Sequence, residues 1–154
     1  EKTQNSASIL RRLTLIFSLG LMIFSIWLLP ISSDNNFPNL KKEDNAFSAQ
    51  KLSSLRSEQR MVFLNFTADW CITCKVNEAI ALNQDKVKKV LDEKNIIYLK
   101  ADWTRKDPEI ASMLASYGRT GVPLYLLFPS QGDPIILPEL LTEDLLLDFL
   151  KEIN

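Results

Sequence analysis

Two cysteines, Cys71 and Cys74, have the spacing of a reversible redox pair. In a helix, residues three apart lie nearly one turn apart on the same side, so their sulfur atoms can form a disulfide. One thiolate can attack a disulfide elsewhere, and the second thiol can then resolve the mixed disulfide. The alternatives are a structural staple, which in so short a loop contributes only about 2 kcal/mol, and a metal site. A metal site within one chain lacks two further soft ligands, which leaves only an intermolecular site.

The absent residue types exclude several classes of function. The chain has 154 residues, no histidine and only two cysteines. This excludes histidine general bases, Ser-His-Asp triads, histidine-containing metal sites, four-cysteine clusters within the chain and folds stapled by several disulfides. Lys and Arg number 18 against 19 Asp and Glu, a net charge of -1, so no basic field indicates a nucleic-acid partner.

The sequence places the cysteine pair between a buried strand and a helix. Residues 61–67, MVFLNFT, form a short β-rich run, and residues 71–83 have a helical pattern. Cys71 therefore falls in the first turn of a helix, where unpaired backbone N–H groups and the helix dipole stabilise a thiolate. We expect Cys71 to attack and Cys74 to resolve.

The other elements alternate in type, which predicts a layered α/β domain with a hairpin and a closing helix. Further strands are predicted at 96–101, 124–128 and 135–137, and further helices at 47–60, 85–93, 108–117 and after Thr142. Asp107 is expected to cap the helix that Gly118 ends, and Asp85 and Thr142 are expected to cap two others. The inward-facing residues expected in the first and last helices are Phe47, Leu52, Leu55, Leu145, Leu146, Phe149 and Leu150.

Residues 13–31, LTLIFSLGLMIFSIWLLPI, contain no charge and predict a transmembrane helix. Their helical length of about 28 Å is close to the thickness of a bilayer core. A secretory signal would have a shorter apolar region and a cleavage motif, and a buried helix of a soluble domain would keep a polar face. Because Arg11 and Arg12 precede the run and Asp34 follows it, the positive-inside bias places residues 1–12 in the cytoplasm.

The predicted organisation has four parts. These are a cytoplasmic-side flank at 1–12, the transmembrane helix at 13–31, a polar linker at 32–46 and a domain at 47–154. The chain begins at Glu1 rather than Met, so we expect it to be a piece of a longer protein that could contain further spans.

Several segments of the domain resemble one protein family. Residues 66–75, FTADWCITCK, resemble the thioredoxin active-site segment, and residues 121–123, GVP, resemble its cis-proline loop. Three further segments, 76–78, 100–108 and 118–125, narrow the resemblance to the C-terminal domain of DsbD-type thiol:disulfide interchange proteins, including their ScsB-type relatives. The resemblance covers about residues 47–154, and residues 13–31 resemble the last transmembrane helix of that family.

The resemblance implies a thioredoxin-like fold, with a central mixed sheet flanked by helices. It implies a reductase domain on the periplasmic side of the bacterial inner membrane, tethered to the bilayer through residues 13–31. Electrons would come from a membrane-embedded redox domain upstream in the same longer chain and pass to a periplasmic disulfide-containing protein or domain. No organic cofactor or metal is needed. By position, Pro123 would be the cis-proline, and the backbone of Val122 would pair with the partner.

The residues that could accept a proton from the cysteines differ from those of many thioredoxins. They carry a buried Asp six residues before the first cysteine, where this chain has Asn65, which can form hydrogen bonds but cannot titrate. Glu78, four residues after Cys74, lies about one turn further along the same helix face and matches the DsbD-type pattern. We expect its charge to disfavour the thiolates. The alternative is a solvated surface Glu.

The neighbouring residues have plainer interpretations. Trp70 is expected to cover the edge of the active site, with a packing role as the alternative. Asp69 and Lys75 are expected to be solvated. For Asp102 and Trp103 a turn cap and a packing aromatic suffice.

Two other functions remain open. A singly anchored thioredoxin-like protein for cytochrome c maturation usually reads W-C-x-P-C, whereas Thr73 precedes Cys74 here. A non-catalytic thioredoxin-like adaptor would have no need for both cysteines. The dipeptide between the cysteines, Ile72-Thr73, lacks the His that oxidising disulfide donors tend to have, which favours a reductant.

Overall fold

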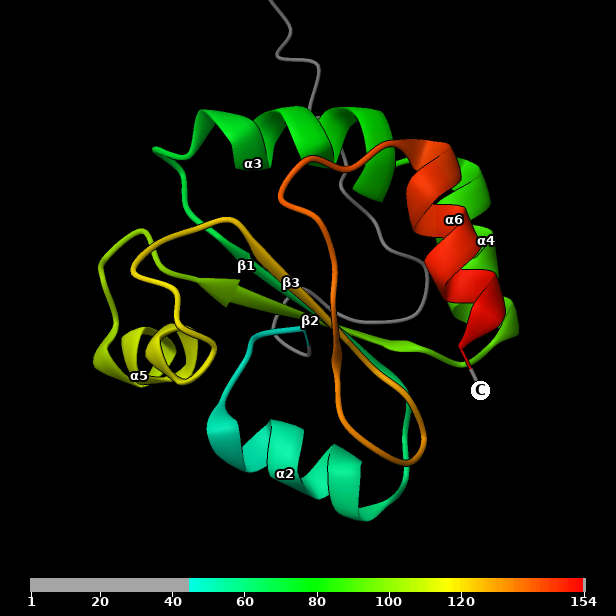
Figure 1. Cartoon of the computed structure of the whole chain (residues 1–154), viewed down its shortest axis with the longest axis horizontal. Coiled ribbons are helices and arrows are strands. Elements are labelled where there is room, and N and C mark those ends of the chain that lie inside the picture. The colour runs from blue at the N-terminus through cyan, green and yellow to red at the C-terminus, as the bar shows by residue number, and fades with distance from the viewer. Residues whose placement is uncertain (1–44, 154) are drawn as a thin grey trace, which may run out of the picture. The chain divides into compact units, whose positions relative to one another are not determined.

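Strand β1 (Val62–Thr67) lies at the centre of a four-stranded sheet in the order β2-β1-β3-β4. It pairs in parallel with β2 (Ile97–Asp102) and antiparallel with β3 (Leu124–Phe128), and β3 pairs antiparallel with the short strand β4 (Ile135–Ile136). The computed structural model describes residues 45–153 (Figure 1). The mixed sheet flanked by helices confirms the predicted thioredoxin-like α/β fold.

Helices cover both faces of the sheet (Figure 1). Helices α2 (Ala49–Ser57) and α5 (Pro108–Ser116) lie on one face. On the other face lie α3 (Ile72–Asn77), the π-helical turn η1 (Glu78–Leu82), α4 (Asp85–Glu93) and α6 (Glu143–Glu152). Each face has its own apolar core, so the sheet is buried on both sides.

The alternation of side chains along β1 decides which residues lie beneath the cysteine helix. Val62, Leu64 and Phe66 pack in the core shared with α2 and α5, whereas Phe63 packs in the core shared with η1, α4 and α6. Because strand side chains alternate, Asn65 and Thr67 point to the same side as Phe63. The two polar residues of β1 are therefore directed toward α3, and both are buried.

Most of the predicted helix signals are found, with one exception. The side chain of Asp107 accepts hydrogen bonds from backbone N–H groups at the start of α5, and that of Thr142 does the same for α6. Gly118 follows α5 with a positive φ of 68°, which favours glycine. The prediction for Asp85 is wrong: it is the first residue of α4, and Gln84 occupies the cap position without a side-chain hydrogen bond. An acidic residue in a first turn is stabilised by the helix dipole without capping it.

Two details of helix geometry differ from the predictions. The helix expected to continue through 71–83 is α-helical only to Asn77, and then widens into the π-helical turn η1. In α6, Leu146, Leu147 and Leu150 are buried, whereas Leu145 is only partly buried. Three consecutive leucines do not reveal which of them faces the core, because the rotation of the helix is set by its packing on the sheet.

The predicted flank at 1–12, the transmembrane helix at 13–31 and most of the linker at 32–46 lie outside the described residues. Among residues 45–153 no helix combines the length and apolar character needed to cross a bilayer. At the start of the described chain, the Lys100 N–H donates to the carbonyl of Asn45 (2.7 Å), and the Phe47 N–H donates to the carbonyl of Lys100 (2.9 Å). The chain thus enters the domain paired along the edge of β2.

Candidate functional site

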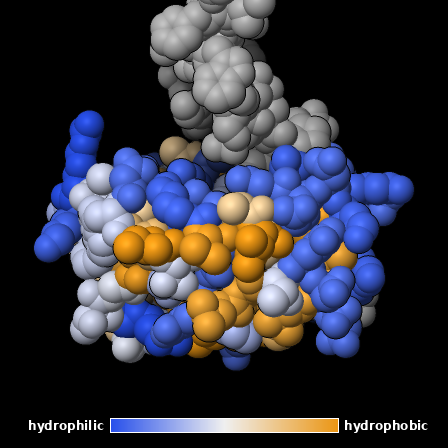
Figure 2. Space-filling model, turned by 90° about the horizontal axis from the view of Figure 1, so that it is seen from above, coloured by the Kyte–Doolittle hydropathy of each residue, from blue (hydrophilic) through white to orange (hydrophobic). Residues whose placement is uncertain are grey.

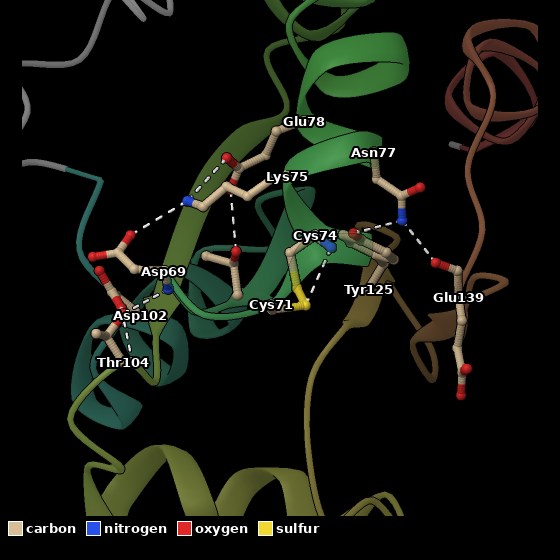
Figure 3. The surroundings of a disulfide bond; sticks show 11 residues. Asp69, Cys71, Cys74, Lys75, Asn77, Glu78, Asp102, Thr104, Tyr125 and Glu139 are labelled. Atoms are coloured by element: carbon tan, nitrogen blue, oxygen red, sulfur yellow. Dashed lines mark hydrogen bonds and ion pairs between the residues drawn. A yellow bond between two sulfur atoms is a disulfide. The ribbon is translucent and has the colours of Figure 1, made fainter.

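A disulfide joins Cys71 and Cys74 at the start of α3, the helix that follows β1 (Figure 3). Their Cα atoms are 5.2 Å apart, within the usual range for a disulfide. Cys71 is the N-cap residue of α3, and its Sγ accepts a hydrogen bond from the Cys74 N–H at 3.1 Å. That N–H is one of the groups a helix start leaves unpaired, so it can stabilise negative charge on the same sulfur after reduction.

The two cysteines differ in how far solvent reaches them. Cys71 is 6% exposed and Cys74 is fully buried. A disulfide is attacked through a nearly linear approach to one sulfur, so accessibility decides which cysteine exchanges with another molecule. Of the two residues, only Cys71 has any solvent-exposed surface.

The loop predicted to face the cysteines is brought against them. The Val122–Pro123 peptide bond is cis, and Val122 packs against the small cluster formed by Ala68, Cys71 and Cys74. Val122 and Pro123 immediately precede β3, which pairs with β1. The strand pairing therefore places the 121–123 loop beside the disulfide, although it is distant in the sequence.

Glu78 lies on one side of α3 in a small charged network (Figure 3). Its carboxylate accepts hydrogen bonds from the Thr67 hydroxyl at 3.1 Å and from the Lys75 ammonium at 3.4 Å, and Lys75 also pairs with Asp69 at 3.3 Å. Burial opposes the charge of Lys75, but the carboxylates of Glu78 and Asp69 outweigh it and raise the pKa of Lys75. The Glu78 side chain is only 20% exposed, so it is not a freely solvated surface residue.

Asn65 is fully buried beneath this region, and its Nδ2 donates to the Tyr98 hydroxyl at 2.7 Å. Burial raises the pKa of Tyr98 well above its ordinary value, against the lowering effect of the hydrogen bond from Asn65. The charge of Glu78 adds to the increase. Tyr98 is therefore neutral at physiological pH, and the Asn65 amide does not titrate.

Thr104 holds the segment immediately before Cys71 in place by hydrogen bonds. The sequence analysis did not predict this role. Its hydroxyl accepts from the Asp69 N–H at 2.9 Å and donates to the Asp102 carboxylate at 2.5 Å, and its carbonyl accepts from the Trp70 indole N–H at 3.3 Å. Burial alone would raise the pKa of Asp102, but the hydrogen bonds from Thr104 outweigh it and lower that pKa. Asp102 also forms the predicted turn cap, because its carboxylate accepts a hydrogen bond from the Thr104 N–H. The exposed Trp70 ring packs near Trp103, with 6.0 Å between the ring centroids.

Asn77 connects the opposite side of α3 to β3 and to residues 139–141 (Figure 3). The sequence analysis did not predict this role. Its Nδ2 donates to the Tyr125 hydroxyl at 2.9 Å and to the Glu139 carbonyl at 2.7 Å, and its Oδ1 accepts from the Leu141 N–H at 3.2 Å. Burial raises the pKa of Tyr125 to about 12, against the lowering effect of the Asn77 hydrogen bond. A polar residue next to Glu78 was visible in the sequence, but nothing there indicated that residues 139–141 would lie beside it.

The arrangement can carry out two-electron exchange at sulfur. It combines one slightly exposed cysteine, one fully buried cysteine and the partly buried carboxylate of Glu78 on the same helix. Among residues 45–153 no group of three or more His, Cys, Asp or Glu side chains is placed to hold a metal ion.

Comparison with known proteins agrees with this geometry. The family described as Thioredoxin-like matches residues 44–130. The thiol:disulfide interchange protein DsbD of Yersinia pestis (strain Pestoides F) is 36% identical over 80 residues, which cover 52% of this chain and 13% of that protein. This chain therefore matches only about one eighth of the length of that relative.

Among solved structures, this chain resembles a single domain over nearly that domain's whole length. The crystal structure of the Neisseria meningitidis DsbD C-terminal domain in the oxidised form has a TM-score of 0.59 and 27% identity, covering 71% of this chain and 97% of that one. The reduced form of the same domain gives a TM-score of 0.58 and 27% identity, with 71% and 99% covered. The similarity thus extends to a domain solved in both redox states.

Proposed function

The chain belongs to the thioredoxin-like family, and from that premise we propose that it relays reducing equivalents from a membrane-embedded dithiol to periplasmic disulfide proteins. Thiol-disulfide exchange at Cys71 and Cys74 carries the relay. The observation that supports it most strongly is the Cys71–Cys74 disulfide at the start of α3, with one slightly exposed cysteine, in a domain similar to the DsbD C-terminal domain. The observed disulfide is the oxidised state of this cycle.

The exchange step follows from the unequal exposure of the two sulfurs. In the reduced protein, the Cys71 thiolate attacks one sulfur of the partner's disulfide, forming a mixed disulfide and releasing the partner's first thiolate, which takes up a proton. Cys74 then loses its proton and attacks the Cys71 sulfur, which releases the second thiol of the partner. The partner gains two electrons and two protons, and this chain returns to the Cys71–Cys74 disulfide. An upstream dithiol recharges it by the reverse exchange.

Glu78 is the carboxylate that we assign to proton handling near the cysteines. It is half-buried on the same helix and bonded to Thr67 and Lys75. A negative charge in that position opposes ionisation of nearby thiols, so it would slow reactions with the wrong acceptors. Asn65, buried and hydrogen-bonded to Tyr98, would serve as a neutral support in the place where many thioredoxins have a carboxylate.

The partner is expected to contact the cis-proline loop and Trp70. Val122 packs on the cysteine cluster and its loop leads into β3, so its backbone would pair with an extended segment of the partner. Trp70 is exposed and held by Thr104, which would give a rigid aromatic contact at low entropic cost.

The location of the domain rests on the sequence before it. The charge-free run at 13–31 would anchor the chain in the bacterial inner membrane, with Arg11 and Arg12 on the cytoplasmic side. Residues 47–154 would then lie in the periplasm, next to a membrane-embedded redox domain upstream in the same longer chain.

A trapping experiment tests the proposal. In cells, Cys74→Ser should accumulate a mixed disulfide with a periplasmic protein, because the resolving thiol is missing, whereas Cys71→Ser should trap nothing. Mass spectrometry of the trapped species identifies the partner and its compartment. If Cys74→Ser traps no protein, the chain does not exchange with protein disulfides, and the adaptor function gains support. If the partners are cytoplasmic, the orientation is wrong.

A further inference from the structure

An apolar stripe runs along the cysteine helix away from the disulfide. Ile72, Val76 and Ile80 are spaced four residues apart on α3 and η1, and they are 81%, 46% and 50% exposed. Residues at this spacing lie on one side of a helix and span about 12 Å. Viewed from above α3, apolar side chains form a continuous band across this face (Figure 2).

Leu140 joins this face from a distant part of the sequence. It is 70% exposed, and the residues on either side of it are tied to α3 through Asn77. Asn77 accepts from the Leu141 N–H and donates to the Glu139 carbonyl. A single buried amide therefore holds the backbone around Leu140 against the helix, and Leu140 adds exposed apolar surface there.

The charges near the stripe are already paired within the molecule. Lys75 pairs with Asp69 and Glu78, and Arg119 pairs with Glu139. A contiguous exposed apolar face is instead typical of an interaction site.

The stripe begins at the residue next to the reactive sulfur. In the mixed disulfide a partner's sulfur is bonded to the Cys71 Sγ at about 2 Å, so the partner's chain must lie over the surface around Ile72. The stripe continues two turns beyond that point, which is more surface than the bond itself requires.

We propose that Ile72, Val76, Ile80 and Leu140 form a docking surface for the exchange partner, which presents an apolar helix directly after its reactive cysteine, while the extended segment before that cysteine pairs with Val122. This inference rests on the proposed function, because the partner is the molecule bonded to Cys71. It adds to the proposed function the property by which this chain would distinguish its partner from other disulfide proteins, namely an apolar surface next to the reactive cysteine. A helix can lay an apolar face along such a stripe of exposed side chains.

Two chromogenic peptides test the selection. Both carry one cysteine in a mixed disulfide with thionitrobenzoate and have equal length and net charge. In one, the two helical turns after the cysteine present Leu and Ala; in the other, Gln and Ser replace them. The reduced full chain attacks the peptide sulfur and releases thionitrobenzoate, and Cys74 then frees the peptide thiol, so two protein thiols become one disulfide. For each variant, the rate with a peptide is divided by the rate with a small reference substrate, the mixed disulfide of N-acetylcysteine and thionitrobenzoate. This division removes differences in the intrinsic reactivity of the variants.

We expect the apolar peptide to half-saturate at about tenfold lower concentration than the polar one, about 1.4 kcal/mol, which partial burial of two aliphatic side chains would supply. Val76→Ser/Ile80→Ser should bring the ratio close to one, and Leu140→Ser should reduce it about threefold. Ile136→Ser is the matched control, because Ile136 is 47% exposed on β4, outside the stripe, and should keep the full ratio. Equal half-saturation of both peptides in the wild type overturns the docking surface, whereas no reaction even with the N-acetylcysteine disulfide overturns the proposed function.

Crosslinking identifies the occupant. The full chain with p-benzoylphenylalanine in place of Ile80 is mixed with the apolar peptide in phosphatidylcholine nanodiscs and illuminated. Crosslinks to the peptide support the proposal. Crosslinks to lipid or to a second copy of the chain, with none to the peptide, would overturn it and name the true occupant.

Discussion

Two consecutive residues on the cysteine helix, Asn77 and Glu78, face opposite surroundings. Asn77 is buried and neutral, and its amide is bonded to Tyr125 and to the backbone of residues 139 and 141. Glu78 is charged and partly open to solvent, with Thr67 and Lys75 as partners. One side of the helix is thus held by neutral hydrogen bonds in the interior, and the other by charges near the surface.

We expect the two sides of this helix to have different duties, structural on the Asn77 side and chemical on the Glu78 side. A buried neutral network costs much free energy when a partner is lost, because the remaining groups stay unsatisfied. A half-exposed ion pair adds little stability, but in the proposed function the charge of Glu78 disfavours the thiolates. We therefore expect substitutions on the Asn77 side to change stability and those on the Glu78 side to change reactivity.

The largest effect is expected for Asn77→Leu. The substitution leaves the Tyr125 hydroxyl, the Glu139 carbonyl and the Leu141 N–H without their partner, so the free energy of unfolding should fall by about 3 kcal/mol. Urea denaturation of the oxidised protein measures it. A loss as small as that of a surface substitution would show that the Asn77 side is not structural.

Tyr125→Phe should cost about 1 kcal/mol, because it removes one hydrogen bond from the same network. In the wild type, the folded pKa of Tyr125 is raised to about 12 by burial, above the ordinary value of about 10. Its contribution to stability is therefore full below pH 10 and is lost as the pH rises toward 12. Alkaline unfolding should begin later in Tyr125→Phe than in the wild type, relative to their stabilities at neutral pH.

Glu78→Gln should change the free energy of unfolding by less than about 1 kcal/mol but alter the reactivity of Cys71. Removing the negative charge favours the thiolate, so the pH profile of Cys71 alkylation in the reduced protein should shift to lower pH. Glu139→Gln is the matched control, since it removes an exposed carboxylate paired with Arg119, and its profile should stay in place. An unchanged profile in Glu78→Gln would remove Glu78 from proton handling.

The smallest effect is expected for Thr104→Val, about 0.5 kcal/mol at neutral pH. Hydrogen bonds from Thr104 lower the pKa of Asp102 in the folded protein, so their stabilisation is present above about pH 4 and is lost as the pH falls through the lowered value. In Thr104→Val the pKa of Asp102 should rise toward its ordinary value, and Thr104→Ser should keep it low. An NMR titration of the Asp102 carboxyl distinguishes these outcomes.

Local patterns were sufficient to predict most elements of residues 45–153. The strands around β1, β2 and β3 have continuous apolar runs, and Asp107, Gly118 and Thr142 act within a few residues of their own position. The prediction was wrong for Asp85, because the helix begins at that residue and Gln84 takes the cap position. Leu145 is only partly buried, because the packing of α6 on the sheet sets how the helix is rotated. Sequence spacing describes a helix but contains no information about the neighbour that it meets.

The chemistry of this protein could be predicted from the sequence alone: it has a cysteine pair three residues apart at a helix start, and no histidine or further cysteine. Those properties depend on residue type and on spacing within one turn. Only the tertiary structure decided which groups surround the pair. Val122, Thr104 and Leu140 come from loops 30 to 66 residues further along the chain than Cys74, and they reach the site because strand pairing and buried hydrogen bonds bring distant segments together. Such contacts arise from the packing of the whole domain, so local sequence patterns do not encode them.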